Sequence, residues 1–341
     1  MELAYEVVPL RTRHAFVIAR GVDPDRRNVL VRLTDGGDEG WGEAAGNKFY
    51  GENADTVVAA LELLRPVIAT ADPWALEALE AEMGRALRFN YAARSAVSAA
   101  AHDLVARRLG VPLYRLWGLD TARMPRSSFT IAIAGSDEAL RQRVTDAAAY
   151  PVLKVKLGTP DRDERIIRAV REAAPEKTLR VDANAAWAPK EALRMADVLA
   201  DLGVEFLEQP VAAHDLAGLR FVRERAPLPV IADESCLVAS DVARLAGAVD
   251  GVNLKLAKCG GLREALAIVH AARAHGMLVM AGCMVETSLG ITTAAHLAPL
   301  LDYADLDGAA LLAEDPFEGA TIEGGEIRVP DRPGIGAVRR A

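Results

Sequence analysis

The chain has 341 residues, of which 51% are hydrophobic and 26% are charged, so it is long enough for two globular domains with a large core. Its formal net charge of −8 argues against nucleic acid and anionic membranes as partners, and no apolar run approaches the roughly 18 residues of a membrane span. The N-terminus lacks a signal-peptide pattern and the three cysteines form no C-x-x-C pair, so we expect a cytoplasmic protein with reduced thiols.

The first third of the chain is typical of a small α+β domain, which we assign to residues 1–120. Apolar residues alternate in four predicted strands, at residues 3–10, 14–20, 28–34 and 41–44. Apolar residues at steps of three and four then predict helices that begin at Ala54, after Pro73 and at Tyr91. The segment Gly110-Val111-Pro112 ends the third of these helices.

Residues 121–318 predict a repeating series of strands and helices. The eight expected strands lie at or end near Ser127–Ala134, Lys156, Asp182, Glu208, Asp233, Lys255, Met277–Gly282 and Tyr303. From Lys156 to Lys255 the charged residues at the strand ends follow at steps of 26, 26, 25 and 22 residues. A strand, a helix and two short loops need about that many residues. A functional group at the C-terminal end of each strand predicts an α/β fold, a TIM-type (β/α) barrel with its active site on one rim.

Helices are expected after the barrel strands, at residues 136–149, 161–174, 189–202, 214–226, 240–248, 262–275 and 286–299. The tail, residues 319–341, is too short for another repeat. We expect it to return to the N-terminal domain.

Three acids end three successive predicted strands: Asp182, Glu208 and Asp233. Adjacent strand ends converge on one rim, and three unpaired carboxylates are costly to bury together without a cation. Hard oxygen ligands select Mg²⁺, with Mn²⁺ as the alternative, over zinc. The competing interpretation is that each acid caps the next helix or pairs with a basic neighbour.

Two lysines flank these acids in chain order, Lys156 before them and Lys255 after them. Strands two and six lie on opposite sides of a closed barrel, so the two amines could remove a proton from one face of a carbon and return one to the other. A divalent ion on a substrate carboxylate would stabilise the resulting enediolate. Lys154 shares a face with Lys156 and is expected to lower the pKa of its neighbour or to hold a substrate oxygen. Lys258 competes with Lys255, but falls in the predicted Cys-Gly-Gly loop.

The motifs, taken in order, resemble those of the muconate-lactonizing subgroup of the enolase superfamily. They are Lys154-x-Lys156, Asp182-Ala183-Asn184, Glu208-Gln209-Pro210, Ala232-Asp233-Glu234-Ser235 and Asn253-Leu254-Lys255-Leu256. The resemblance implies an enolase-like, modified barrel with an N-terminal α+β capping domain that the C-terminal tail completes. It also implies one of several activities that share the metal and lysine set: muconate cycloisomerase, o-succinylbenzoate synthase, N-acyl amino acid racemase or dipeptide epimerase.

The segment that distinguishes these activities is Tyr303-Ala304-Asp305-Leu306-Asp307-Gly308. An Asp-x-Asp-Gly at the end of strand eight resembles the dipeptide epimerase pattern, which implies that Asp305 and Asp307 bind the substrate ammonium. The alternative is that both are turn residues. By the same resemblance Cys283 and Val285 line the dipeptide pocket, and Thr130, on the small inward face of the first barrel strand, is a further substrate contact.

Arg20 lies in the first loop of the cap, which in this superfamily covers the barrel mouth, and its cation could pair with an acidic substrate side chain. The alternative is an exposed arginine without such a role. Lys48, in the second cap loop, is a further candidate for an anion contact.

The sequence therefore predicts a Mg²⁺-dependent dipeptide epimerase that inverts the C-terminal residue of a dipeptide such as L-Ala-L-Glu. The resemblance places such an activity in cell-wall peptide metabolism, and we expect a homo-oligomer. The rivals are the other activities of the subgroup and, from a different class, a non-catalytic metal- or peptide-binding barrel.

Overall fold

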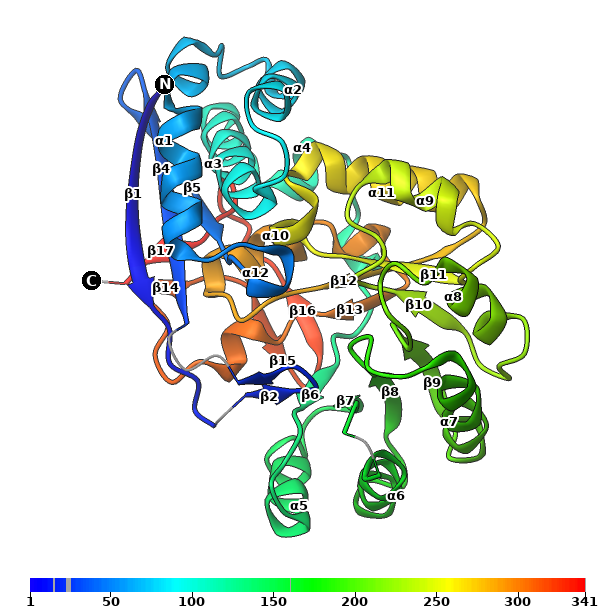
Figure 1. Cartoon of the computed structure of the whole chain (residues 1–341). Coiled ribbons are helices and arrows are strands. Elements are labelled where there is room, and N and C mark those ends of the chain that lie inside the picture. The colour runs from blue at the N-terminus through cyan, green and yellow to red at the C-terminus, as the bar shows by residue number, and fades with distance from the viewer. Residues whose placement is uncertain (15, 23–25, 160, 341) are drawn as a thin grey trace.

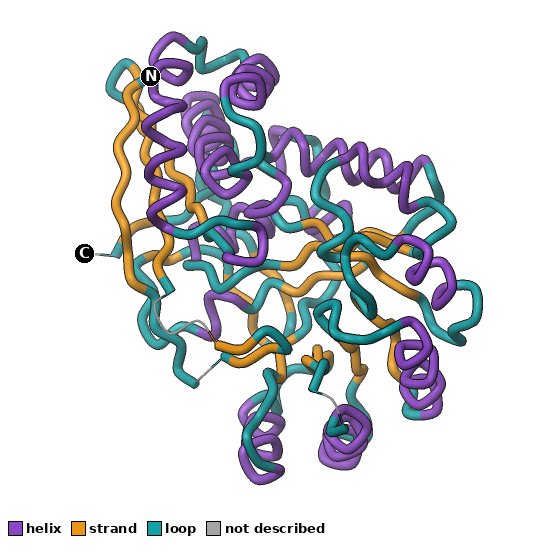
Figure 2. The backbone as a smooth tube through the Cα atoms, in the orientation of Figure 1, coloured by secondary structure: helices purple, strands orange, loops and turns teal. Residues whose placement is uncertain are grey.

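The computed structural model describes residues 1–14, 16–22, 26–159 and 161–340. Eight parallel strands form one sheet in chain order, from β6 (Phe129–Ile131) to β13 (Tyr303–Asp305), with helices around them (Figures 1 and 2). A parallel bridge between Ser127 and Ala304 brings the first strand to the last. The predicted (β/α) barrel with an N-terminal α+β domain is confirmed.

The barrel strands between these two are β7 (Val152–Lys156), β8 (Thr178–Asp182), β9 (Val204–Glu208), β10 (Val230–Ala232), β11 (Gly251–Leu254) and β12 (Leu278–Gly282). The helices that cover them are α5 (Asp137–Asp146), α6 (Asp163–Ala173), α7 (Pro189–Asp201), α8 (Leu216–Arg223), α9 (Ala239–Leu245), α11 (Leu262–Ala274) and α12 (Ser288–Ala295). Each predicted helix is present within a few residues of its expected bounds, although α12 ends earlier and a short 3-10 helix, η3 (Ala298–Leu300), follows it.

The register of the sheet explains the even spacing of the charged residues. Lys156 pairs with Asp182 across β7 and β8, and Asp182 pairs with Glu208 across β8 and β9. Residues that are paired across parallel strands point to the same face of the sheet. Because these three side chains point into the barrel, repeats of equal length place them in one row on the rim.

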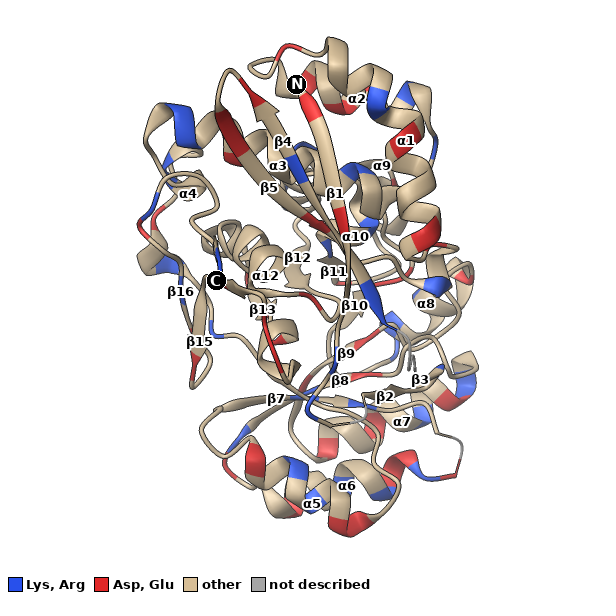
Figure 3. Ribbon diagram, turned by 90° about the vertical axis from the view of Figure 1, so that its left-hand side faces the viewer, with Lys and Arg blue, Asp and Glu red and all other residues tan. Residues whose placement is uncertain are grey.

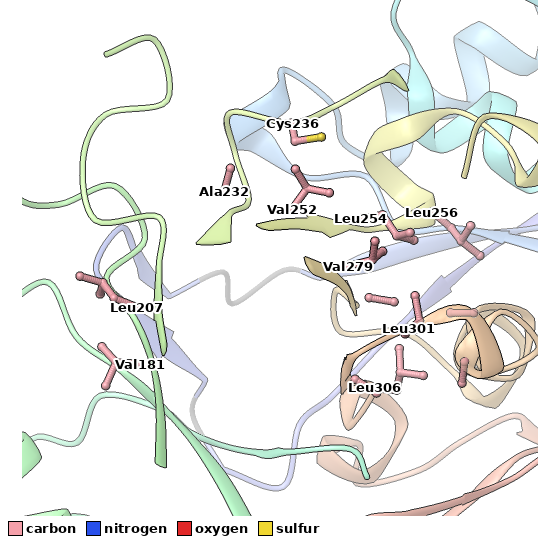
Figure 4. Close-up of a cluster of buried hydrophobic side chains, with 14 of the residues drawn as sticks. Val181, Leu207, Ala232, Cys236, Val252, Leu254, Leu256, Val279, Leu301 and Leu306 are labelled. Carbon is pink, nitrogen blue, oxygen red and sulfur yellow. The ribbon is translucent and has the colours of Figure 1, made fainter. Parts of the chain in front are cut away.

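Two apolar layers hold this row in place. Outward residues such as Val181, Leu207 and Val252 belong to the large core between strands and helices (Figure 4). Inside the barrel, Phe206, Ile231 and Met280 form a separate buried cluster below the charged rim. The alternation of the strands therefore gives the charged row both a packed floor and a packed outer support.

The N-terminal domain is a three-stranded antiparallel sheet in the order β1 (Glu2–Pro9), β4 (Arg27–Asp35), β5 (Asp38–Ala44), packed against three helices. These helices are α1 (Ala54–Thr70), α2 (Leu76–Ala86) and α3 (Tyr91–Leu109). The small residues of α3 allow a close approach, since a Cβ at Gly42 would lie 2.1 Å from the Ala96 carbonyl oxygen.

The prediction of one strand at residues 14–20 is wrong. The chain instead turns back on itself between β2 (Val17–Ile18) and β3 (Gly21–Val22), which pair only with each other. Gly21 has φ of 97°, a left-handed conformation that ends an extended strand and favours glycine. Residue 15 of the predicted strand lies outside the described residues.

The tail touches both parts of the molecule. A hairpin of β15 (Thr321–Glu323) and β16 (Glu326–Arg328) contacts the barrel, where the Ser127 amide donates to the Gly325 carbonyl. Further on, β17 (Val338–Arg339) pairs with β14 (Phe317–Glu318), and the Ile335 amide donates to Asp103 of α3. These contacts support the predicted return to the N-terminal domain; the exact division at residues 120 and 318 stays a prediction, and residue 341 is not among the described residues.

Short elements complete the fold: α4 (Leu113–Leu116), α10 (Leu256–Cys259), and the 3-10 helices η1 (Lys48–Tyr50), η2 (Thr121–Arg123) and η4 (Gly308–Leu311). The outer helices α5 and α6 carry both acidic and basic residues (Figure 3). Across the described ranges, no helix combines the length and the apolar character needed to cross a bilayer.

Candidate active site

The three acids that end β8, β9 and β10 form one cluster. Asp182, Glu208 and Asp233 are fully buried, and each offers an oxygen that lies within 4.8 Å of the oxygens of the other two. Three carboxylates this close are unfavourable in a low-dielectric interior unless cations compensate them. An all-oxygen set with room for further ligands suits a hard divalent cation, so the residues present fit the predicted Mg²⁺.

Two lysines hold the ends of this acid cluster. The Lys156 Nζ donates to Asp182 at 2.6 Å, and the Lys255 Nζ donates to Asp233 at 2.6 Å. Strands β8, β9 and β10 separate β7 from β11 on one side of the barrel, and β12, β13 and β6 on the other. The two amines therefore approach the acid cluster from opposite sides, as the sequence predicts, and both line the cavity above it.

Lys154 lies deeper in the barrel than Lys156, and its side chain has no exposed surface. Its Nζ is 2.6 Å from Glu208, 2.8 Å from Asp305 and 3.4 Å from Asp182. Burial alone would lower the pKa of Lys154, but the carboxylates, Asp305 first, hold that pKa well above its ordinary value. Lys154 is thus a compensated cation within the acid cluster, and it is not one of the described side chains that line the cavity.

Lys258 occupies the opposite side of Asp233 from the cavity. It lies on the one-turn helix α10 rather than in the predicted loop, and its buried Nζ donates to both the carboxylate and the backbone carbonyl of Asp233. The carboxylate of Asp233 is therefore held between two ammonium groups, and only Lys255 reaches the cavity among these two lysines.

The cavity above the acids has a volume of about 380 Å³ and lies between the cap loops and the barrel mouth. The cap contributes Arg20, Lys48 and Phe49 to its wall, and the β12 loop contributes Cys283 and Val285. At the end of β12 a glycine is required by space: a Cβ at Gly282 would lie 2.9 Å from both Lys255 Cε and Asn253 Nδ2. The lysine consequently reaches the cavity past a position with no side chain.

Asp305 and Asp307 lie together in the cavity wall, as predicted, but with different partners. Asp305 accepts hydrogen bonds from the Lys154 Nζ and the Ser128 hydroxyl at 2.8 and 2.6 Å. Asp307 accepts from the backbone amide of Thr130 at 2.6 Å. Burial and the charge of Asp305 raise the pKa of Asp307 to about 7. The carboxylate of Asp307 would therefore be stabilised by a bound cation.

Arg20 is held within the cavity wall rather than free in solvent. Its Nη1 donates to Glu234 at 2.8 Å and to the Asn184 carbonyl at 3.1 Å, and its guanidinium carbon lies 4.3 Å from the centre of the Phe49 ring. About 30% of the side-chain surface remains exposed. The second cap loop places Lys48 in the same wall.

The acids differ in their protonation. Burial acts to raise each pKa, but Lys156 and Lys154 lower the pKa of Asp182 to about 2, and Lys255 and Lys258 hold that of Asp233 well below its usual range. For Glu208, burial and the charge of Asp182 dominate, and its pKa rises to about 7. The lysines therefore favour the charged form of Asp182 and Asp233, whereas burial favours the neutral form of Glu208.

Several polar residues of the site were not predicted. Asn253 donates to Glu208 at 2.7 Å, Asn184 donates to Asp182 at 3.2 Å, and Glu234 holds Arg20. Asn253 lies two residues before Lys255, so strand alternation could have identified it. Glu234 follows Asp233 directly, and Asn184 follows Asp182 after one residue, but their contacts depend on loop geometry, such as the left-handed φ of 47° at Asn184.

Comparison with known proteins gives matches along the full chain. Residues 3–118 match the family model of the mandelate racemase/muconate lactonizing enzyme N-terminal domain, and residues 137–340 match the enolase C-terminal domain-like model. An L-Ala-D/L-amino acid epimerase of Maribacter sp. is 39% identical, with 98% of each chain covered. An L-Ala-D/L-Glu epimerase of Bacteroides thetaiotaomicron is 37% identical, with 99% of this chain and 88% of the relative covered. The solved dipeptide epimerase of Enterococcus faecalis V583, complexed with Mg and L-Leu-L-Tyr, has a TM-score of 0.93 and 33% identity, with 98% of each chain covered.

Proposed function

Because this chain belongs to the mandelate racemase/muconate lactonizing enzyme family of the enolase superfamily, we propose that it is a dipeptide epimerase. It inverts the α-carbon of the C-terminal residue of a dipeptide, and L-Ala-L-Glu is the leading substrate. The observation that carries this proposal is the placement of Lys156 and Lys255 at opposite ends of one acid cluster, each held by a different carboxylate.

Asp182, Glu208 and Asp233 would hold Mg²⁺, the ion present in the solved relative from Enterococcus faecalis. When bound, the cation would draw electron density from the substrate carboxylate and make the adjacent α-proton more acidic. Lys154, which contacts two of these acids, fixes their positions and compensates part of their charge.

The two cavity lysines then exchange one proton each with the α-carbon. One lysine, entering as the neutral amine, takes the proton from one face, and the other, entering as the ammonium, donates a proton to the opposite face. The carbon is thereby inverted, and the two lysines have exchanged charge states. For the opposite epimer the roles are reversed, so both lysines are needed for epimerisation.

Substrate recognition is assigned to the part of the cavity wall formed by β13, β6 and the loop after β12. Asp305 and Asp307 would bind the ammonium of the first residue, because a buried carboxylate pair favours a cation. Thr130 positions Asp307, and Cys283 and Val285 border the dipeptide. An N-acyl amino acid, a succinylbenzoate or a muconate has no ammonium to offer this pair, which disfavours the rival activities of the subgroup.

Arg20 is the candidate for recognition of the second residue. Its guanidinium lines the cavity and can pair with a glutamate side chain of the substrate, provided that it keeps or exchanges its contact with Glu234. This would favour Ala-Glu over dipeptides with an apolar second residue. A relative that binds L-Leu-L-Tyr shows that the family also includes enzymes that take apolar dipeptides.

The test is hydrogen exchange in D₂O with Mg²⁺ and L-Ala-L-Glu, followed by NMR and chiral analysis of the glutamate. We expect deuterium at the glutamate α-carbon and accumulation of the L,D-epimer. An Arg20→Met variant should lose about tenfold or more in kcat/KM for Ala-Glu but retain turnover of Ala-Leu. Absence of exchange with every dipeptide tested would remove the proposed function and leave a binding barrel; equal losses for both substrates would remove only the role of Arg20.

The cellular setting extends the same proposal. Cys236, Cys259 and Cys283 are free thiols, which suits the cytoplasm, and an Ala-Glu epimerase would act on peptides released from the cell wall. A homo-oligomer is our expectation for its assembly, which light scattering coupled to size-exclusion chromatography would measure.

A further inference from the structure

A second cavity adjoins the first at the barrel seam. It has a volume of about 660 Å³ and lies between the segment around Arg13, helix α5 and the turn of η4. Three residues border both cavities: Phe16, Thr130 and Leu311. The second cavity is therefore continuous with the wall that holds Asp307, and no step of the proposed reaction uses it.

The seam between β6 and β13 explains why a space exists there. Main-chain pairing ends where the Ser128 amide donates to the Ala304 carbonyl. Thr130 is the next residue of this strand whose side chain faces the barrel interior. Its backbone amide donates to the side chain of Asp307 instead of to a neighbouring strand. A side-chain bridge thus replaces the ladder at this height, and the Thr130–Asp307 contact forms part of the partition between the two cavities.

The main chain at Gly308, the residue after Asp307, is closely packed. A Cβ at Gly308 would lie 2.4 Å from the Met284 carbonyl oxygen and 3.2 Å from the Cys283 Sγ. The main chain after Asp307 therefore lies directly against the β12 loop, and the space beside Asp307 is the first cavity and, past Thr130, the second. The second cavity has the larger volume of the two.

The second cavity is suited to an uncharged, apolar group. Phe129 and Tyr150 contact each other in its wall, with ring centres 4.6 Å apart, and the small residues Ala132 and Ala310 leave room. Its charged residues, so far as the structure describes them, already have partners: Arg13 donates to the Leu312 carbonyl, and His14 lies 3.6 Å from Asp146. Arg143 donates to the Ala132 and Ile133 carbonyls.

We propose that this second cavity receives the side chain of the first residue of the dipeptide, so that the enzyme accepts large apolar residues at that position. The inference rests on the proposed function, because it takes the ammonium on Asp307 as its starting point. The ammonium and the side chain share one carbon, so the side chain must leave from the immediate neighbourhood of Asp307. The seam beside Thr130 leads to the larger of the two adjoining spaces, and the apolar wall beyond it would remove the side chain from water.

The experiment compares Ala-Glu with Leu-Glu and Phe-Glu in the exchange assay. The wild type should process all three, with kcat/KM for Leu-Glu and Phe-Glu within about tenfold of that for Ala-Glu. Ala310→Trp, which fills the second cavity from its half-buried edge, should lower kcat/KM for Leu-Glu and Phe-Glu by about tenfold or more relative to kcat/KM for Ala-Glu. Ala313→Trp, at an exposed position three residues on, is the matched control and should change none of them.

Three results would overturn the inference. First, the wild type could process only Ala-Glu. Second, Ala310→Trp could reduce kcat/KM for all three dipeptides in the same proportion. Third, Ala310→Trp could leave exchange in the dipeptides unchanged but abolish exchange in a tripeptide extended at its N-terminus. The last result would assign the cavity to a peptide extension rather than to the first side chain. Failure of every dipeptide, by contrast, would count against the proposed function itself.

Discussion

The cavity has two sides that are built in different ways. On one side, β7 to β11 form a parallel ladder, with one irregularity between β8 and β9, in which Lys156, Asp182 and Glu208 are paired in register. On the other side, at the seam of β13 and β6, the ladder stops and the side chain of Asp307 bridges to the Thr130 amide. We call the first side the ladder wall and the second the seam. A ladder fixes side chains through many backbone bonds, whereas a seam leaves room that side chains can shape.

This difference matches the division of labour that we propose. Proton transfer needs groups fixed to within a fraction of an ångström, and the ladder wall supplies them. Recognition of different dipeptides needs variable space, and the seam and the cap loops supply it. Variants in the ladder wall should therefore lower kcat most, and variants in the seam should mainly raise KM.

The largest expected effect comes from the two lysines of the ladder wall. Lys156→Met and Lys255→Met should each lower epimerisation by about 10³-fold or more, because each removes one of the two proton-transfer groups. Each single variant should still exchange the α-proton of one epimer, with retention, through the lysine that remains. NMR of L,L- and L,D-dipeptides in D₂O measures both quantities.

The matched control is Lys190→Met, at an exposed position on α7, which should behave as the wild type. The Lys156→Met and Lys255→Met variants should retain exchange of opposite epimers. If both retained exchange of the same epimer, the two amines would not act on opposite faces, and the comparison between the ends of the acid cluster would be wrong.

The two sides of the cavity also differ in how well the sequence predicts them. The ladder wall follows from periodicity: equal repeats place charged residues at equal heights, so the acid cluster could be predicted from spacing. The seam and cap contacts join residues that are far apart, such as Lys154 with Asp305 and Arg20 with Glu234, separated by 151 and 214 positions. These pairs depend on barrel closure and on docking of the cap, which leave no local periodicity in the sequence.

The error at residues 14–20 has the same origin. Apolar alternation there is real, but it does not show that the chain reverses after two residues to form the β2–β3 hairpin beside the cavity. The prediction that Lys258 lies in a loop failed for a related reason, since α10 is only one turn long and its role is set by a distant carboxylate.

The intermediate effect concerns the seam. Asp307→Asn should raise KM for Ala-Glu and lower kcat/KM by about 10- to 100-fold at pH 7.5, because the ammonium loses a charged acceptor. In the wild type, kcat/KM should fall as the pH drops through about 7. The pKa of Asp307 is raised to that value by burial and by Asp305, so below it the protonated form offers no charge to the ammonium.

In the Asp307→Asn variant, the part of the fall in kcat/KM at low pH that comes from protonation of Asp307 should be absent. The Asp197→Asn variant, on an exposed part of α7, should keep it. Calorimetric titration of Mg²⁺ should give similar affinities for both variants, since Asp307 contacts none of the three acids in the described structure. A variant with unchanged KM and an unchanged pH profile would contradict the proposed role of the seam.

The smallest effect on catalysis should come from Lys258, which supports the ladder wall from α10 through its contact with Asp233 but does not face the cavity. Lys255 and Lys258 hold the same carboxylate of Asp233, yet Lys258 is completely buried and only Lys255 borders the substrate space. Lys258→Met should therefore change kcat for exchange by less than about tenfold, while urea unfolding should show a loss of about 2 kcal/mol. The loss stays moderate because Asp233 keeps its bond to Lys255. If Lys258→Met abolished exchange and Lys255→Met spared it, exposure to the cavity would not identify the proton-transfer lysine, and the two residues would have to exchange roles.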